Sequence, residues 1–186
     1  MSEKRLELRV VSGIYRRRKL LAPNSKDVRP TKDRIREAIF SALGNIEGFS
    51  FLDLYAGSGA MGIEALSRGA SYAAFVDINK ESIDCIKDNL LSLNIKEGYN
   101  IYRDLDTNVL KQFQENKRSF DIVFLDPPYK KGKYEDIIRF IISNELINKG
   151  GIIVCESGHP INIDESQFSK CKTYKYGEIN IYILWR

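Results

Sequence analysis

The chain has 186 residues, 43% of them hydrophobic, and 29 Lys and Arg against 25 Asp and Glu, a net charge of +4. This length suits one domain that buries about two-thirds of the surface of its unfolded chain, so folding needs no disulfide or metal. The three cysteines are odd in number and widely spaced, which disfavours a disulfide framework or a zinc site. No apolar run approaches the roughly 18 residues of a membrane span, and no apolar leader begins the chain, so we expect a cytoplasmic protein.

Residues 1–24 are expected to form an arm that differs from the rest of the chain. In "RLELRVVSGIYRRRKLLAP", apolar residues alternate from Leu6 to Val10, and Ser12 and Gly13 follow as turn residues. Apolar residues resume at Ile14, so the pattern predicts a β-hairpin.

Residues 25–186 are expected to form the core of the single domain. A helix is predicted to begin near Pro30 and to end at Gly44. From Phe51 onward, short apolar runs alternate with amphipathic stretches, which indicates an α/β domain with parallel strands covered on both faces. The predicted strands span residues 51–55, 72–77, 100–103, 121–126 and 151–156, and the predicted helices between them span about 60–68, 80–93, 106–116 and 133–147. The last runs, "CKTYKYG" and "INIYILWR", predict an antiparallel hairpin at the edge of the sheet.

The stretch "FLDLYAGSGAMG" ends in G-x-G-x-x-G, which lets backbone N–H groups and a helix N-terminus approach a ligand closely. Asp53 lies four residues before Gly57, where its carboxylate would repel a pyrophosphate but attract a cation. Asp77 ends the next strand, where it can accept hydrogen bonds from both hydroxyls of a ribose. This pair favours S-adenosylmethionine over NAD. The alternative is a plain strand-to-helix turn, with Asp77 as a helix cap.

A second motif, Asp126–Tyr129 in "FLDPPY", also follows an apolar strand, so it is expected at the same ligand-binding edge of the sheet as Asp53 and Asp77. The Asp126 carboxylate and the Pro127 carbonyl can accept the two N–H bonds of an amino group on a base, and the tyrosine can stack on the base. The prolines stiffen the loop. This chemistry favours methylation of a base amino group, which needs orientation rather than a nucleophile or a metal. A rigid turn with a stacked tyrosine is the alternative.

The segments "DLYAGSGAMGIEALSRGA" and "FLDPPY", with "RVVSGIYRRRKL" and "RPTKDRIREAIF" before them, resemble the RsmD family of bacterial 16S ribosomal RNA guanine-N2 methyltransferases. The resemblance runs from about Leu8 through the C-terminal hairpin. It implies a Rossmann-like class I methyltransferase fold with a seven-stranded, mostly parallel sheet, and S-adenosylmethionine as methyl donor. It also implies one guanine of 16S ribosomal RNA as the target, in an assembled or assembling small ribosomal subunit. We further expect a monomer and no membrane partner.

The resemblance also assigns roles to residues. The cofactor would contact residues Asp53, Tyr55, Ala56, Gly57, Ser58, Gly59, Asp77, Ile78, Asp104 and Thr31. Asp104 is preferred to Asp106 as the acid near the adenine. The guanine would be held by the catalytic set Asp126, Pro127, Pro128 and Tyr129.

Basic residues are expected to bind the RNA. Because Arg16 to Lys19 would make both faces of a strand basic, we predict a projecting hairpin that grips phosphates, with a solvated charge run as the alternative. The full set of RNA-binding residues is Arg16, Arg17, Arg18, Lys19, Arg29, Lys130, Lys131 and Lys133. The target base should be unpaired or flipped out.

Three other functions stay open on the sequence alone. An adenine-N6 DNA methyltransferase could use the same D-P-P-Y motif, although nothing resembles a DNA target-recognition domain. A non-catalytic RNA-binding assembly factor could keep the fold, although binding alone does not need that motif. An NAD-dependent oxidoreductase would bind a nicotinamide instead.

Overall fold

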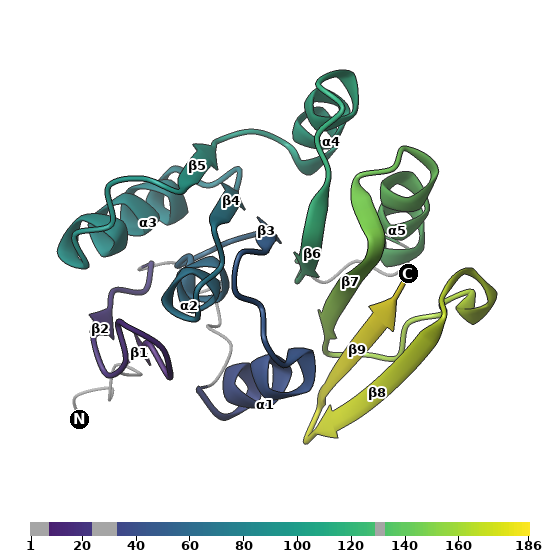
Figure 1. Cartoon of the computed structure of the whole chain (residues 1–186), viewed down its shortest axis with the longest axis horizontal. Coiled ribbons are helices and arrows are strands. Elements are labelled where there is room, and N and C mark those ends of the chain that lie inside the picture. The colour runs from purple at the N-terminus through teal and green to yellow at the C-terminus, as the bar shows by residue number, and fades with distance from the viewer. Residues whose placement is uncertain (1–7, 24–32, 129–132) are drawn as a thin grey trace.

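A computed structural model describes residues 8–23, 33–128 and 133–186 of the chain (Figure 1). The described helices are α1 (Asp33–Leu43), α2 (Ala60–Ser67), α3 (Lys80–Ser92), α4 (Asp106–Glu115) and α5 (Lys133–Ser143). The strands of the main sheet are β3 (Ser50–Leu54), β4 (Tyr72–Val76), β5 (Tyr99–Tyr102), β6 (Phe120–Leu125), β7 (Ile147–Ser157), β8 (Lys170–Tyr176) and β9 (Ile179–Trp185). A two-stranded ribbon joins β1 (Leu8–Arg9) to β2 (Lys19–Leu20), and a short 3₁₀ turn, η1 (Glu165–Gln167), precedes β8.

The main sheet has seven strands in the order β5-β4-β3-β6-β7-β9-β8, which Figure 1 shows running across the molecule. The first five strands of that order are parallel, whereas β9 runs antiparallel to both β7 and β8. The prediction of a mostly parallel sheet with an antiparallel C-terminal hairpin is therefore confirmed. The near-continuous apolar runs of β3, β4 and β6 become buried strands, as expected when helices cover both faces.

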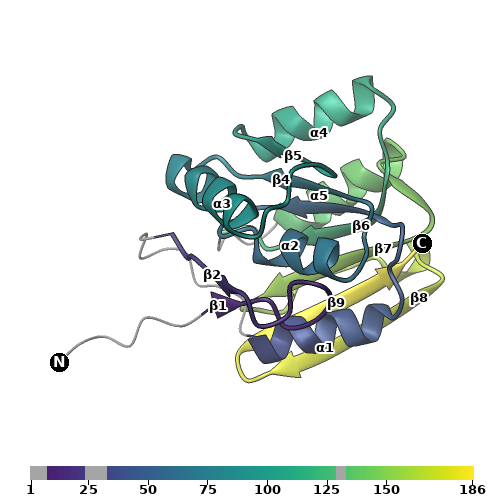
Figure 2. The same cartoon turned by 60° about the vertical axis from the view of Figure 1, so that its left-hand side comes forward.

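Helices form a layer on each face of the sheet (Figure 2). The helices α4 and α5 cover one face, where Phe113 and Ile141 pack in one core cluster with Val123 and Leu125. The helices α1, α2 and α3 cover the opposite face, where residues of α1 and α2 pack with β3, β6, β7 and β9. Each face of the sheet thus buries its own apolar cluster under its helices. The described helices cover the two faces of the sheet and leave the ends of its strands uncovered.

The boundary between α5 and β7 differs from the prediction of a helix to residue 147 and a strand from 151. The helix ends at Ser143, because Glu145 adopts a left-handed φ of 55° that an α-helix cannot continue. The chain then enters β7 at Ile147, which is buried and pairs with Phe120. The register is irregular before it resumes at Ile122 and Ile152. Burial of the apolar side chain at 147 therefore extends the strand backward into the predicted helix.

The N-terminal ribbon confirms the predicted hairpin but contradicts its predicted form. The strands pair only at Leu8 with Leu20 and at Arg9 with Lys19. The segment Arg16–Arg18 lies in a turn rather than in a strand, and Arg17 has a left-handed φ of 68° while its N–H donates to the Val10 carbonyl at 2.8 Å. A turn at the surface avoids the cost of burying charge that a strand with basic side chains on both faces would incur.

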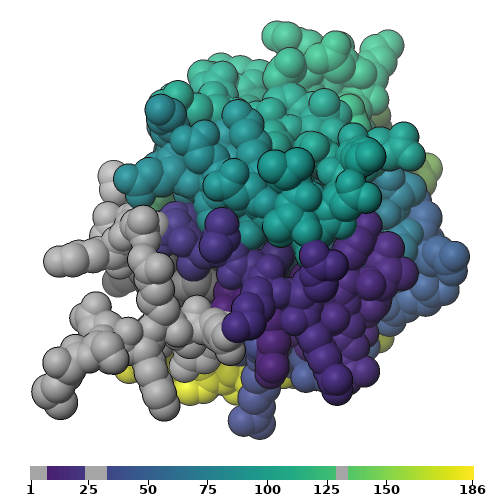
Figure 3. Space-filling model, turned by 90° about the vertical axis from the view of Figure 1, so that its left-hand side faces the viewer, coloured from purple at the N-terminus to yellow at the C-terminus, as the bar shows by residue number. Residues whose placement is uncertain are grey.

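The ribbon also does not project from the molecule, as Figure 3 shows for the purple surface of residues 8–23. Leu8, Val10 and Leu20 are buried in the cluster that α2 and α3 line. A Cβ atom at Gly13 would lie 1.8 Å from the Ser67 carbonyl oxygen of α2, so the segment touches that helix closely enough to require glycine. The predicted projecting arm is therefore wrong, and residues 8–23 form a strap on the surface of the core.

The strap is held by a buried carboxylate in α2. The backbone N–H groups of Val11 and Ser12 donate to the Glu64 carboxylate at 2.7 and 2.9 Å. The Nε atoms of Arg36 and Arg68 lie 3.4 and 2.8 Å from the same carboxylate. Since the Glu64 side chain is fully buried, these contacts stabilise a charge that would otherwise be costly to bury. The strap and the helix that follows the glycine turn are thus joined directly.

Candidate active site

The glycine turn leaves β3 through a run of left-handed backbone. Tyr55, Gly57 and Gly59 have φ values of 80°, 54° and 75°. The N–H groups of Tyr55 and Ala56 both donate to the Val76 carbonyl of β4, at 3.0 and 2.8 Å. A left-handed φ suits glycine but strains tyrosine by about 1 to 3 kcal/mol, and the two bonds to β4 help to hold Tyr55 there. The predicted tight turn is therefore present, with an additional strained residue at its start.

The turn is also packed tightly from below. Ser58 is buried, and its carbonyl accepts a hydrogen bond from the Asn89 side chain of α3 at 2.9 Å. A Cβ atom at Gly62 would lie only 2.3 Å from Cε1 of Phe75 in β4. The third glycine of the motif thus allows α2 to approach the sheet, and the first two shape the turn.

Asp53 lies beneath the turn rather than on its surface. Its side chain is buried, and the carboxylate accepts a hydrogen bond from the Gly62 N–H at 2.9 Å. The pKa of Asp53 is raised to about 7, because burial and, to a smaller extent, the charge of Asp77 raise it by more than the Gly62 bond lowers it. Asp53 is therefore bonded to the start of α2 beneath the turn, where its charge lies close to that of Asp77.

Asp77 reaches from the end of β4 to the glycine turn. One carboxylate oxygen accepts a hydrogen bond from the Gly57 N–H at 2.8 Å, and the other accepts from the Asn79 N–H at the same distance. The N-cap of α3 is Asn79, whose side chain accepts from the Glu81 N–H. The alternative that Asp77 itself caps the helix is therefore not what the structure shows.

Four carboxylates, Asp53, Asp77, Asp126 and Glu156, lie at the carboxyl ends of neighbouring parallel strands and are called the carboxylate arc below. The register pairs Leu54 with Leu125 and Leu125 with Cys155, which places the ends of β3, β6 and β7 level with one another. Because Leu125 and Cys155 face α4 and α5, the residues that follow them face α1 and α2. Burial and the charges of Glu156 and Asp53 raise the pKa of Asp126 well above its usual range.

The structure describes the Asp126–Tyr129 motif as far as Pro128. Pro127 is buried and Pro128 is exposed at the end of β6. Within the parts of the chain that the structure describes, the Asp126 carboxylate makes no hydrogen bond. A mostly buried acceptor without a donor is unfavourable in isolation, so this carboxylate is suited to receive an N–H group from a ligand.

The sequence offers Asp104 and Asp106 as the acid near an adenine, and Asp104 is preferred. Asp104 is exposed, and it accepts hydrogen bonds from the Leu105 N–H at 2.7 Å and the Asn108 side chain at 2.9 Å. Asp106 is instead buried, where it accepts a hydrogen bond from the Tyr55 hydroxyl. The preference for Asp104 stays a prediction. Ile78, also assigned to the cofactor, is 61% exposed beside Asp77 and presents an apolar surface.

Two features of the site escaped the sequence reasoning. The bond from the Tyr55 hydroxyl to Asp106 ties the glycine turn to α4, and no spacing rule links residues so far apart. Glu156 was included in a predicted strand, yet it was not assigned to the site. The signal was present, because the run "GIIVCE" ends in an acid just as "DIVFLD" does.

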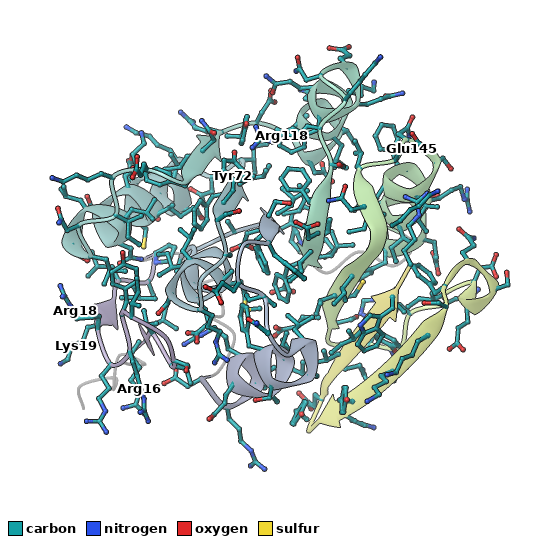
Figure 4. All side chains as sticks on the ribbon, in the orientation of Figure 1. Arg16, Arg18, Lys19, Tyr72, Arg118 and Glu145 are labelled. Carbon is teal, nitrogen blue, oxygen red and sulfur yellow. The ribbon has the colours of Figure 1, made fainter. Side chains whose placement is uncertain are left out.

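The predicted RNA-binding residues are only partly described. Figure 4 shows Arg16, Arg18 and Lys19 on the outer side of the strap, away from the sheet. Arg17 is also exposed, and the Arg18 guanidinium donates to the Ser92 carbonyl at 2.8 Å. Five predicted site residues lie outside the described residues, as does the side chain of Lys133: Arg29, Thr31, Tyr129, Lys130 and Lys131.

Two kinds of feature are absent from residues 8–23, 33–128 and 133–186. No three His, Cys, Asp or Glu side chains there are arranged to hold a metal ion. No helix in the same ranges is long and apolar enough to cross a membrane.

The sheet order and the solved structure of a putative methyltransferase from Escherichia coli, at 28% identity and a TM-score of 0.81, define a Rossmann-like class I methyltransferase fold. The model of the family described as Conserved hypothetical protein 95 matches residues 8–185. The chain belongs to this family, and its resemblance to the RsmD family is confirmed.

Known relatives cover most of the chain. It is 37% identical to the ribosomal RNA small subunit methyltransferase D of Haemophilus influenzae, over 81% of this chain and 79% of the relative. It is 34% identical to the protein of the same name from Escherichia coli, over 81% and 75%. The solved structure of a hypothetical protein from Thermus thermophilus superposes with a TM-score of 0.80 at 26% identity, over 95% of this chain and 98% of that one.

Proposed function

We propose that this protein methylates the exocyclic N2 amino group of one guanine in 16S ribosomal RNA, with S-adenosylmethionine as the methyl donor. The coarser reaction, methylation of ribosomal RNA, follows from the family and from relatives named as small subunit methyltransferases. The observation that carries the finer reaction is the Asp126 carboxylate, which lies without a hydrogen-bond donor from the described residues at the carboxyl end of β6.

The carboxylate arc fits this cofactor. S-adenosylmethionine supplies an electrophilic methyl group on a positively charged sulfur. Neighbouring carboxylates shielded from water favour such a cation. Burial is the main cause of the raised pKa values of Asp53 and Asp126, and the charge of a neighbouring carboxylate raises each further, from Asp77 for Asp53 and from Glu156 and Asp53 for Asp126. Asp77 has acceptor capacity left for ribose hydroxyls beside its bond to Gly57, and the exposed Ile78 offers a flat apolar contact for the adenine.

The residues after β6 orient the base. The Asp126 carboxylate and the Pro127 carbonyl each accept one N–H bond of the guanine amino group, which fixes the direction of the nitrogen lone pair. The methyl group would pass from the sulfonium to the amino nitrogen, so that the S–C bond of the donor breaks and a neutral thioether leaves. The nitrogen would then be positive and would have to lose one proton. The Asp126 carboxylate, already bonded to that N–H, is placed to accept it.

The strap provides a basic surface for the RNA backbone. The side chains of Arg16, Arg17 and Lys19 are exposed. They belong to the strap, whose backbone Glu64 binds to the core. Phosphates bound there would lie on a rigid part of the molecule rather than on a mobile arm, so contacts with the backbone can set the position of the target base. The substrate would be a small ribosomal subunit, assembled or assembling, and the protein would act as a cytoplasmic monomer.

The function is tested in cells that lack this protein. We expect mass spectrometry of their small-subunit RNA to show one N2-methylguanine fewer than in the parent. The wild-type gene should restore the modification. Asp126→Asn should not restore it, while the purified variant still binds S-adenosylmethionine in calorimetry. An unchanged set of methylguanines would contradict the proposal, and labelling of duplex DNA but not of ribosomal RNA would favour the adenine-N6 DNA methyltransferase instead.

A further inference from the structure

Glu156 is the member of the carboxylate arc that belongs to neither motif. It is 7% exposed near the end of β7. Its backbone is fixed on two sides, since it pairs with Ile181 of β9 and its carbonyl accepts a hydrogen bond from the Tyr134 hydroxyl at 2.5 Å. The carboxylate therefore projects from a rigid position on the strand.

The position of Glu156 places it beside Asp126. Leu125 pairs with Cys155, so the next residue on each strand is a neighbour on the face that α1 and α2 cover. Neighbouring strands lie about 4.8 Å apart, which brings both side chains within reach of one small ligand group. Their closeness is also evident from the charge of Glu156, which contributes to the raised pKa of Asp126.

Two adjacent carboxylates, Glu156 buried and Asp126 partly buried, are complementary to a row of hydrogen-bond donors when they are ionised, because an ionised carboxylate only accepts. The edge of guanine that carries N2 presents such a row, with the N1–H beside the two N2–H bonds. Adenine differs at the corresponding place, since its amino group lies beside N1, which is an unprotonated acceptor. A second carboxylate there would face a lone pair and would repel adenine, so the same pair can attract one base and reject the other.

We propose that Glu156 accepts a hydrogen bond from the N1–H of the target guanine while Asp126 holds the amino group, so that Glu156 sets the preference for guanine over adenine. This inference rests on the proposed function and extends it to base selection. It also explains how a D-P-P-Y motif, which can hold the amino group of adenine or of guanine, is restricted to guanine.

The test compares two substrates that differ at one base. Small subunits are prepared from cells that lack the protein, with plasmid-borne 16S RNA carrying either guanine or adenine at the mapped target position. Wild-type protein should methylate the guanine subunits and leave the adenine subunits nearly unmodified. In Glu156→Gln the amide N–H can donate to N1 of adenine, so we expect the guanine-to-adenine rate ratio to fall roughly 10- to 100-fold, the range of one hydrogen bond to a charged group.

Further variants separate selection from a structural role. Glu156→Asp keeps the charge, so it should retain the preference for guanine even if transfer slows. Glu178→Gln is the matched control, because Glu178 is an exposed glutamate at the tip of the β8–β9 hairpin, and it should leave both rates unchanged. Cofactor affinity is measured by calorimetry and folding by urea unfolding for each variant.

The outcomes distinguish a failure of the inference about Glu156 from a failure of the proposed function on which it rests. If Glu156→Gln lowers both rates equally, or if Glu156→Asp loses the preference as fully as Glu156→Gln does, base selection by Glu156 is refuted while guanine methylation stands. If the wild-type protein forms no N2-methylguanine on the guanine subunits, the proposed function itself fails. A ratio that falls in Glu156→Gln alone, with cofactor affinity preserved, supports the inference.

Discussion

Gly62→Ala offers a direct measure of how closely α2 must approach the sheet. The new Cβ would meet Cε1 of Phe75 at 2.3 Å, whereas ordinary contact begins at 3.4 Å, so one group must move by the difference of about 1 Å. The Phe75 ring cannot yield easily, because it is fully buried and packs edge-on against Tyr99 at 6.5 Å. The movement must therefore come largely from α2 and the glycine turn.

Two opposing effects set the size of the change. Alanine favours a helix by about 1 kcal/mol over glycine, and Gly62 lies within α2, away from the left-handed glycines of the turn. Overpacking a rigid core costs about 1 to 3 kcal/mol, and a 2.3 Å contact belongs at the upper end of that range. We therefore expect the free energy of unfolding to fall by about 1 to 2 kcal/mol.

The assay is urea unfolding of Gly62→Ala, Phe75→Leu and the double variant. Because the leucine is smaller, the double variant should be more stable than the sum of the single changes predicts, by about 1 kcal/mol. Gly150→Ala is the control, since its Cβ would lie in open space and its cost comes from its left-handed φ of 76° alone. Equal stability of Gly62→Ala and wild type, or an undiminished loss in the Phe75→Leu background, would refute the reasoning.

Three further predictions concern charge. Because the pKa of Asp53 is raised from 3.8 to about 7, its contribution to stability is present at low pH and is lost as the pH rises through 7. Asp53→Asn should therefore remove a slope of up to about 1.4 kcal/mol per pH unit between pH 4 and 7 in urea unfolding; identical slopes would disprove this. Glu64→Ala should cost about 3 to 5 kcal/mol and accelerate hydrogen exchange at the Val11 amide, whereas unchanged protection there would mean that Glu64 does not hold the strap. Replacing both Arg16 and Arg17 with alanine should reduce the salt dependence of RNA binding by about two phosphate contacts in filter binding at varied salt, and an unaltered slope would remove the strap from the RNA interface.

Local sequence patterns predicted much of the fold. The alternation of apolar runs with amphipathic stretches predicted the α/β order, because strands buried on both faces need continuous apolar sequence and covering helices need one apolar side. The parallel strands, the C-terminal hairpin and the glycine turn all appeared where these patterns placed them. The end of α5 did not, since it depends on the left-handed Glu145 and on burial of Ile147, which are not visible in the helical period.

The N-terminal strap shows the limit of local patterns more clearly. Its alternation predicted a hairpin correctly, but four consecutive basic residues suggested a projecting strand. The structure instead places Arg16 to Arg18 in a turn, because Glu64 and Ser67 of α2 bind the backbone of the strap from more than fifty residues away. Hydrogen bonds between segments so far apart in the chain leave no pattern in the sequence of either segment.

The sequence by itself determined which residue types stand at the ends of the strands, and therefore the class of ligand that the site can accept. Asp53, Asp77 and Asp126 could be assigned to one edge because all parallel strands in a sheet end on the same side. Only the tertiary structure decided which of these carboxylates are adjacent, which is buried beneath the turn, and that Glu156 joins them. The reason is that strand order and register arise from packing between distant segments, whereas the hydrophobic period reports only on each segment alone.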